Sequence, residues 1–359
     1  MSKEEEIKSI EEEIKKTKYN KATQYHIGQL KAKLSRLKED ATSKKSTRGG
    51  FSYSVKKSGD ATVILVGFPS VGKSTLLNSI TSADSKIAAY EFTTLDVVPG
   101  VMLYNSAQIQ VLDIPGLVSD AASGRGRGKE ILSVVRNADL ILIVADKPNQ
   151  VERVRHELYD SGFRLNETPP NVIIKKMNRG GVKVSSAVKL KHIDKKMVQL
   201  IVNERGIHNA EILIRENLTL DRLIDATSKN RVYVKARVLY NKVDLLSEEE
   251  RKKLPKDFIQ ISCLKKEGIE NLKKIIWNNL CLMRIYLKKI GKMPDLEEPL
   301  IMKKGSNIYD VAEKIHKQFA YKLDYARIWG PSARFEGQKV GARKSLSDTD
   351  IVELHFISI

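Results

Sequence analysis

Residues 61–81, ATVILVGFPSVGKSTLLNSIT, decide the fold of this chain. The stretch ATVILV is an apolar run typical of a strand that is buried on both faces. The glycine-rich loop GFPSVGKS at 67–74 follows it, and apolar residues then recur at helical spacing. The sequence therefore predicts a strand, a loop and a helix in this order. The loop matches GxxxxGK[ST], a pattern that binds phosphate groups when it lies between a strand and a helix.

Each residue type in this loop has a physical reason. Successive backbone N–H groups surround the phosphates, and the helix dipole assists them. We expect Lys73 to reach the β- and γ-phosphates and Ser74 to coordinate Mg²⁺ through its hydroxyl. Glycine keeps Cβ atoms out of the tight turn. The predicted nucleotide-binding residues here are Gly67, Phe68, Pro69, Ser70, Val71, Gly72, Lys73, Ser74 and Thr75.

The segment DIPG at 113–116 ends the next long strand. Asp113 is placed like the carboxylate that holds Mg²⁺ in phosphate-transferring proteins, usually through water. The Gly116 N–H is a candidate contact of the γ-phosphate. The motif DxxG alone is weak, but its position after GFPSVGKS makes it informative. The predicted contacts are Asp113, Ile114, Pro115 and Gly116.

Two further segments, NKVD at 241–244 and SCL at 262–264, end later strands. Asp244 offers two carboxylate oxygens to the N1–H and N2–H₂ groups of guanine, a donor pair that adenine lacks. We expect Asn241 to support the loop, and the stem of Lys242 to lie over the ring. Backbone N–H groups of SCL are candidates for guanine O6. The predicted contacts are Asn241, Lys242, Asp244, Ser262, Cys263 and Leu264.

Strands and helices alternate from Ala61 onward, which predicts an α/β fold with a mostly parallel sheet and helices on both faces. This alternation stops near residue 165 and resumes near 232. We therefore predict a small α+β domain at 165–232, inserted into a sheet domain at 61–287. Residues 1–50 are expected to form a helical hairpin and a linker, and residues 288–359 a compact β-grasp module.

The charge is strongly positive and unevenly distributed. Lys and Arg number 63 against 44 Asp and Glu, for a net charge of +19. Residues 164–235 carry a net +8 and residues 1–60 a net +6, so the insert and the hairpin are candidate contacts for RNA. Two alternatives stay open: a solvated lysine-rich surface, and a hairpin that packs only on its neighbour.

Composition also excludes several classes of protein. The two cysteines, Cys263 and Cys281, exclude a disulfide scaffold and a paired-CxxC zinc site within the chain. The apolar runs are too short to span a membrane, and the N-terminus lacks the apolar region of a signal peptide. We expect a cytoplasmic protein with no membrane partner.

The four motifs, in this order, resemble those of P-loop GTPases of the translation-factor-related class. The segment YEFTTL at 90–95 is similar to the Obg-like group within that class. The whole chain then resembles the DRG (developmentally regulated GTP-binding) protein family, whose C-terminal module is a TGS domain. The similarity is carried by HIGQLKAKLSRL, GRGRGKE, the inserted domain, and the C-terminal segments KIHK, ARIWG and QKVG.

This resemblance implies a slow, Mg²⁺-dependent GTPase that associates with ribosomes or translating RNA through the hairpin, the insert and the TGS domain. It also implies a possible small stabilising partner protein. Thr94 would be the switch I ligand of Mg²⁺, beside Phe92 and Thr93. The implied catalytic residues are Lys73, Thr94 and Gly116, and the implied metal ligands are Ser74, Thr94 and Asp113.

One position bears on the chemistry. Many GTPases place a water-orienting Gln after the DxxG glycine, but this chain has Leu117, a replacement that the Obg-like group shares. Potassium-activated relatives often carry Asn where this chain has Ser70, which leaves K⁺ open as a second cation. Arg125 and Arg127 are candidates either for transition-state contacts or for a switch surface.

Two other functions are alternatives to a GTPase switch. The first is an RNA- or ribosome-binding assembly protein that binds guanine nucleotide with little turnover, which Leu117 favours. The second is an ATP-using metabolic kinase, which NKVD disfavours.

Overall fold

The computed structural model describes residues 3–18, 20, 22–43, 59–81, 97–114, 134–228 and 230–357. The chain divides into two compact units. We call Met1–Tyr53 with Leu158–Tyr233 the insert unit, and Ser54–Glu157 with Val234–Ile359 the P-loop unit. Within the described ranges, none of the helices is both long and apolar enough to cross a bilayer.

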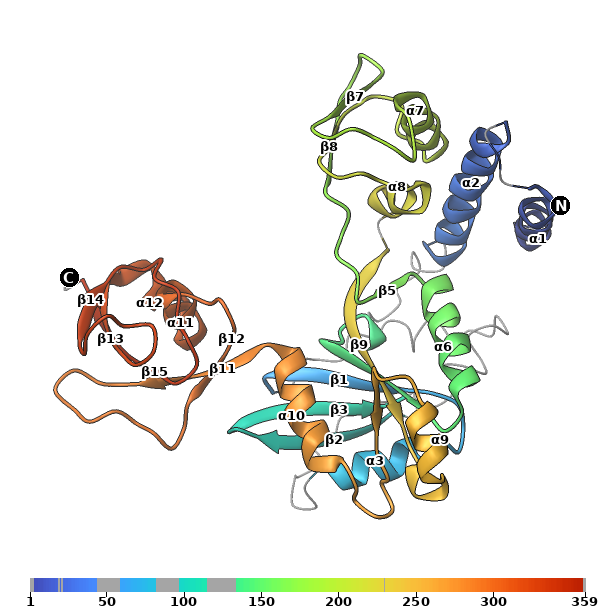
Figure 1. Cartoon of the computed structure of the whole chain (residues 1–359). Coiled ribbons are helices and arrows are strands. Elements are labelled where there is room, and N and C mark those ends of the chain that lie inside the picture. Colours follow the sequence, from blue (N-terminus) through green and yellow to red (C-terminus); the bar gives the residue numbers. More distant parts are fainter. Residues whose placement is uncertain are drawn as a thin grey trace. The chain divides into compact units, whose positions relative to one another are not determined.

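The main sheet of the P-loop unit has the strand order β10-β9-β4-β1-β3-β2. Figure 1 labels β9, β1, β3 and β2 of this sheet. β2 is antiparallel to β3, and the other neighbouring pairs are parallel. This confirms the predicted α/β fold with a mostly parallel sheet. The strands are β1 (Ala61–Val66), β2 (Val98–Tyr104), β3 (Ala107–Asp113), β4 (Leu140–Ala145), β9 (Val232–Tyr240) and β10 (Phe258–Gln260).

The central strands explain why their sequences are continuously apolar. Every residue of β1 and β4 is buried, because both faces of the sheet are covered. On one face, Leu65 of β1 packs in the same core as Leu76 and Leu272, which lie on α3 and α10. The helical elements of this part of the chain are α3 (Lys73–Ile80), α6 (Pro148–Asp160), η1 (Val243–Leu245), α9 (Glu248–Lys253) and α10 (Ile269–Leu280).

A second sheet follows α10, with the order β12-β11-β15-β13-β14 and helices packed on it. Its first strand begins at Leu282, ahead of the boundary at 288 expected from the sequence. Cys281 adopts a left-handed conformation (φ 52°) that ends α10 and leads directly into this strand. The elements are β11 (Leu282–Leu287), β12 (Leu300–Lys303), α11 (Ile308–Ile315), α12 (Lys317–Lys322), β13 (Leu323–Trp329), β14 (Gln338–Val340) and β15 (Asp350–Phe356).

The insert unit combines the N-terminal hairpin with a small α+β structure, whose sheet has the order β6-β8-β7. Ala32 of the hairpin is fully buried in the same core as Val198 and Leu223 of the inserted helices. A Cβ atom on Gly28 would lie 2.9 Å from Met197 Sδ, so glycine permits this close approach. The hairpin therefore packs on its neighbour, and its contact with RNA stays a prediction. The elements are α1 (Lys3–Lys16), α2 (Gln24–Ser43), β5 (Phe163–Leu165), β6 (Val172–Lys176), β7 (Val182–Ser186), α7 (Lys195–Glu204), β8 (Ala210–Ile214) and α8 (Leu220–Thr227).

A buried charge network lies within the insert unit. Arg164 has a side chain only 4% exposed, and its Nε and Nη2 donate to the two carboxylate oxygens of Asp225 at 2.6 and 2.8 Å. Arg231 Nε donates to the same carboxylate at 2.6 Å. The Arg164 guanidinium also lies 3.7 Å from the ring centroid of Tyr159. One buried carboxylate is thus shared by two arginines through charge-assisted hydrogen bonds.

Candidate nucleotide-binding site

The loop GFPSVGKS connects β1 to α3, and two of its glycines are required by close contacts. A Cβ atom on Gly67 would lie 2.2 Å from the carbonyl oxygen of Val144. At Gly72, where φ is +93°, a Cβ atom would lie 2.4 Å from Asn241 Nδ2. Any side chain at these positions would push the loop away from its neighbours. The loop is therefore closely fitted between the ends of β4 and β9.

Lys73 begins α3 and is buried, with 8% of its surface exposed. Its Nζ donates to the carbonyl oxygens of Gly67 and Phe68, both at 3.0 Å. Burial lowers the pKa of Lys73, and the nearby carboxylate of Asp113 partly opposes this shift. The ammonium is thus held in the loop by neutral backbone dipoles, so its charge is available to a phosphate.

Ser74 of α3 meets Asp113, the last residue of β3. Ser74 Oγ donates to Asp113 Oδ2 at 2.7 Å, and the carboxylate is almost fully buried. Asp113 Oδ1 is also buried and has no hydrogen-bond partner among the described residues. A hydroxyl and a carboxylate are hard oxygen donors of the kind that Mg²⁺ prefers, with its remaining positions taken by waters and phosphate oxygens. These two residues therefore fit a magnesium ion.

Asn241 joins three segments that are far apart in the sequence. Its Nδ2 donates to the carbonyl oxygen of Val71 at 2.9 Å, and its Oδ1 accepts from the backbone N–H of Cys263 at 3.2 Å. Its own backbone N–H donates to Ala145 at the end of β4. The side chain is buried, so both amide contacts are protected from water. The loop GFPSVGKS and the segments NKVD and SCL therefore form one site.

The other residues of NKVD and SCL lie around this connection. Asp244 follows Lys242 and Val243, and a hydrogen bond from the Ser262 hydroxyl lowers the pKa of its carboxyl group. An ionised carboxylate is the form that accepts two hydrogen bonds from guanine. Burial raises the pKa of Cys263 to about 11, so its thiol stays protonated at neutral pH. Leu264 is largely exposed.

Part of the predicted site lies outside the described residues. This holds for Phe92, Thr93, Thr94, Pro115, Gly116, Leu117, Arg125 and Arg127.

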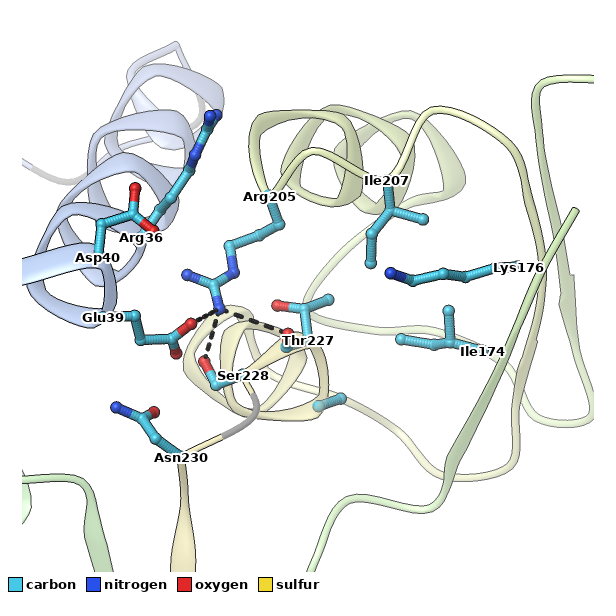
Figure 2. Close-up of a pocket in the computed structure, with 11 residues that line it drawn as sticks. Arg36, Glu39, Asp40, Ile174, Lys176, Arg205, Ile207, Thr227, Ser228 and Asn230 are labelled. Atoms are coloured by element: carbon cyan, nitrogen blue, oxygen red, sulfur yellow. Dashed lines mark hydrogen bonds and ion pairs between the residues drawn. The ribbon is translucent and has the colours of Figure 1, made fainter. Parts of the chain in front are cut away.

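A separate hollow of about 520 Å³ lies in the insert unit, between α2, α7 and the end of α8 (Figure 2). Arg205 reaches across it, and its Nη2 donates to Glu39 at 2.5 Å and to Ser228 Oγ at 3.4 Å. The Arg205 side chain is 4% exposed, and its charge is already balanced by Glu39. We therefore interpret this hollow as part of the packing between the hairpin and the inserted helices, where the ion pair of Arg205 and Glu39 joins the two.

The fold and these loops define a P-loop nucleotide-binding domain. Three family models match this chain one after another, from residue 62 to residue 356. A model described as "50S ribosome-binding GTPase" matches residues 62–176, and one for the C-terminal region of that domain matches residues 179–282. The TGS domain model matches residues 283–356, which is the sheet that begins with β11.

Curated relatives match the chain over nearly its whole length. It is 51% identical to an uncharacterized GTP-binding protein of Methanocaldococcus jannaschii, over 98% of this chain and 92% of that protein. It is 46% identical to GTP-binding protein 1 of Schizosaccharomyces pombe, over 98% of both chains. Developmentally-regulated GTP-binding protein 2 of Homo sapiens is 42% identical, again over 98% of both. The chain therefore belongs to the family of developmentally regulated GTP-binding proteins.

Proposed function

We propose that this protein binds GTP and GDP with Mg²⁺ and hydrolyses GTP slowly, as a molecular switch that associates with ribosomes or RNA in the cytoplasm. The single observation that supports the nucleotide part best is the bridging amide of Asn241, which contacts both Val71 and Cys263. It brings the phosphate-binding loop and the guanine-reading segments into one site. The family relationship supports the same proposal.

In this proposal, each described residue has one task. Lys73 places its positive charge on the β- and γ-phosphates, where negative charge develops during hydrolysis. Ser74 and Asp113 hold the magnesium ion, which neutralises charge on the phosphate oxygens when it is bound. Asp244 reads guanine through its two carboxylate oxygens, and Ser262 keeps that carboxylate ionised and oriented.

Hydrolysis itself needs a water that is held in line with the γ-phosphate. The side chain of Leu117 has no polar atom to orient that water, so we assign the task to backbone groups such as the Gly116 N–H, with Thr94 as a further magnesium ligand. A low intrinsic rate follows from this arrangement. Potassium near Ser70, or charge from Arg125 and Arg127, would raise the rate.

The ribosome or RNA part of the proposal is supported by exposed charge in the insert unit. Lys175 and Lys183 flank Glu211 on neighbouring strands of the small sheet, and both lysines are exposed. Val172 and Val184 pack on the opposite, core side of the same sheet. The two exposed lysines leave a net positive charge around Glu211, which suits a phosphate backbone. The TGS domain and a small partner protein stay part of this proposal.

The test is GTP hydrolysis by the purified full-length protein in Mg²⁺, with K⁺ or Na⁺, and with or without ribosomes. We expect slow turnover that rises with K⁺ or ribosomes and falls at least about 100-fold in Ser74→Ala, since that variant loses a magnesium ligand. Lys175→Glu with Lys183→Glu is expected to weaken the ribosome effect and leave the intrinsic rate unchanged.

The second candidate is an assembly protein that binds guanine nucleotide and turns it over very little, and Leu117 favours it. Tight GDP binding without turnover under any of these conditions would support this candidate and contradict the switch.

A further inference from the structure

A carboxylate that the sequence motifs do not include lies beside the nucleotide site. Asp146 directly follows β4, and its Oδ2 lies 2.6 Å from Lys242 Nζ. The same ammonium donates to the backbone carbonyl of Ser70 at 2.9 Å. Asp146, Lys242 and Ser70 thus form a bridge from the end of β4, through NKVD, to the phosphate-binding loop.

Both loops joined by this bridge contain an unfavourable backbone conformation. Ser70 and Lys242 each have φ of +63°, in the left-handed region that residues other than glycine seldom adopt. Such conformations persist where surrounding contacts hold them in place. The Lys242 side chain provides such a contact, because it extends from the backbone of NKVD and its ammonium binds the Ser70 carbonyl oxygen and the Asp146 carboxylate.

Asp146 itself is firmly held, so it can position its partner. Its backbone N–H donates to Gln150 Oε1 at 3.1 Å, and its carbonyl oxygen accepts from the Tyr240 hydroxyl at 2.7 Å. Burial disfavours its ionised form, but hydrogen bonds with Lys242 and Gln150 prevail and lower the pKa of the carboxyl group. Asp146 Oδ1 is buried and has no hydrogen-bond partner among the described residues. The ion pair of this carboxylate is therefore made through Oδ2, with Lys242.

We propose that Asp146 is a positioning residue for guanine-nucleotide binding, which acts through Lys242 to keep the phosphate-binding loop and the segment NKVD in the relation that the nucleotide requires. This inference rests on the proposed function, because it assumes that the nucleotide occupies this site. Asp146 contacts neither phosphate nor base in this scheme. Its effect is therefore expected on nucleotide retention and not on the choice of base.

The test is the rate of GDP release from the full-length protein, followed with a fluorescent GDP analogue in Mg²⁺. Asp146→Asn keeps the size of the side chain and removes its charge. We expect release to become about 3- to 10-fold faster, the range for one partly exposed, charge-assisted hydrogen bond. The preference for GDP over xanthosine diphosphate is expected to stay as in the unsubstituted protein.

A double-mutant cycle distinguishes positioning from a general structural effect. In a Lys242→Met background, Asp146→Asn is expected to change the release rate less than about 2-fold, because the partner through which it acts is gone. Asp348→Asn is the matched control: it removes the same charge from the Arg284 ion pair, at 2.8 Å in the C-terminal sheet. The control is expected to leave GDP release unchanged.

Unchanged release in Asp146→Asn would overturn the proposal, and so would an equal acceleration with and without Lys242. A protein that does not bind GDP before any substitution would instead contradict the proposed function itself, so the two failures are distinguishable.

Discussion

Two buried cations, one in each unit, are held in opposite ways. Lys73 of the P-loop unit is bound by two neutral carbonyl oxygens, and burial lowers its pKa. Arg164 of the insert unit is bound by the Asp225 carboxylate; although burial opposes its charge, this partner raises its pKa. A cation without a carboxylate in direct contact retains its charge for a ligand, whereas a neutralised cation stabilises the fold.

The largest expected effect is on the network of Arg164, Asp225 and Arg231. Asp225→Ala leaves Arg164 and Arg231 without their shared carboxylate. We expect the free energy of unfolding of the insert unit to fall by about 3–5 kcal/mol, the usual cost of removing one partner of a buried ion pair. Chemical denaturation, with proteolysis to locate the unfolded region, measures this.

The matched control for that change is Glu11→Ala, which removes an exposed ion pair with Lys38 and is expected to cost less than about 1 kcal/mol. GDP affinity of the folded Asp225→Ala protein is expected to be unchanged. Equal destabilisation by the two substitutions would show that the Arg164 network does not stabilise the insert unit.

A somewhat smaller effect is expected at Lys73, and it concerns GTP hydrolysis instead of the free energy of unfolding. Lys73→Met is expected to reduce GTP hydrolysis about 10²–10³-fold, as for loss of one donor aimed at the transition state. Because burial disfavours the charged form of Lys73, the neutral side chain is expected to leave the unfolding temperature without nucleotide unchanged or higher. A clear fall in that temperature would mean that Lys73 has a structural role like that of Arg164.

The sequence predicted the parts of the site that depend on local pattern. The strand before GFPSVGKS, the helix after it, and the position of NKVD at the end of a strand all follow from apolar periodicity and glycine placement. The α/β fold follows from the alternation of strands and helices, and the family follows from a resemblance of motifs along the whole chain; both are confirmed. Which residues contact nucleotide stays a prediction.

What the sequence did not predict depends on contacts between distant segments. Asp146 carries no motif, and its importance appears only when the ends of β4 and β9 lie side by side. The early start of the C-terminal sheet was missed because it depends on the left-handed conformation of Cys281. No sequence rule marks a cysteine for that conformation, since glycine and asparagine are its usual occupants.

The measurement that tests the central claim most directly is calorimetric binding of GDP and xanthosine diphosphate to the full-length protein and to Asp244→Asn. We expect the unsubstituted protein to prefer GDP. We also expect Asp244→Asn to bind GDP about 10- to 100-fold more weakly, because the carboxylate that accepts two guanine hydrogen bonds is gone. The variant is expected to prefer xanthosine diphosphate, because the asparagine amide N–H donates to the C2 carbonyl oxygen that xanthine has in place of the guanine amino group. Equal GDP affinity in both proteins would contradict the assignment of Asp244, and with it a guanine site built around Asn241.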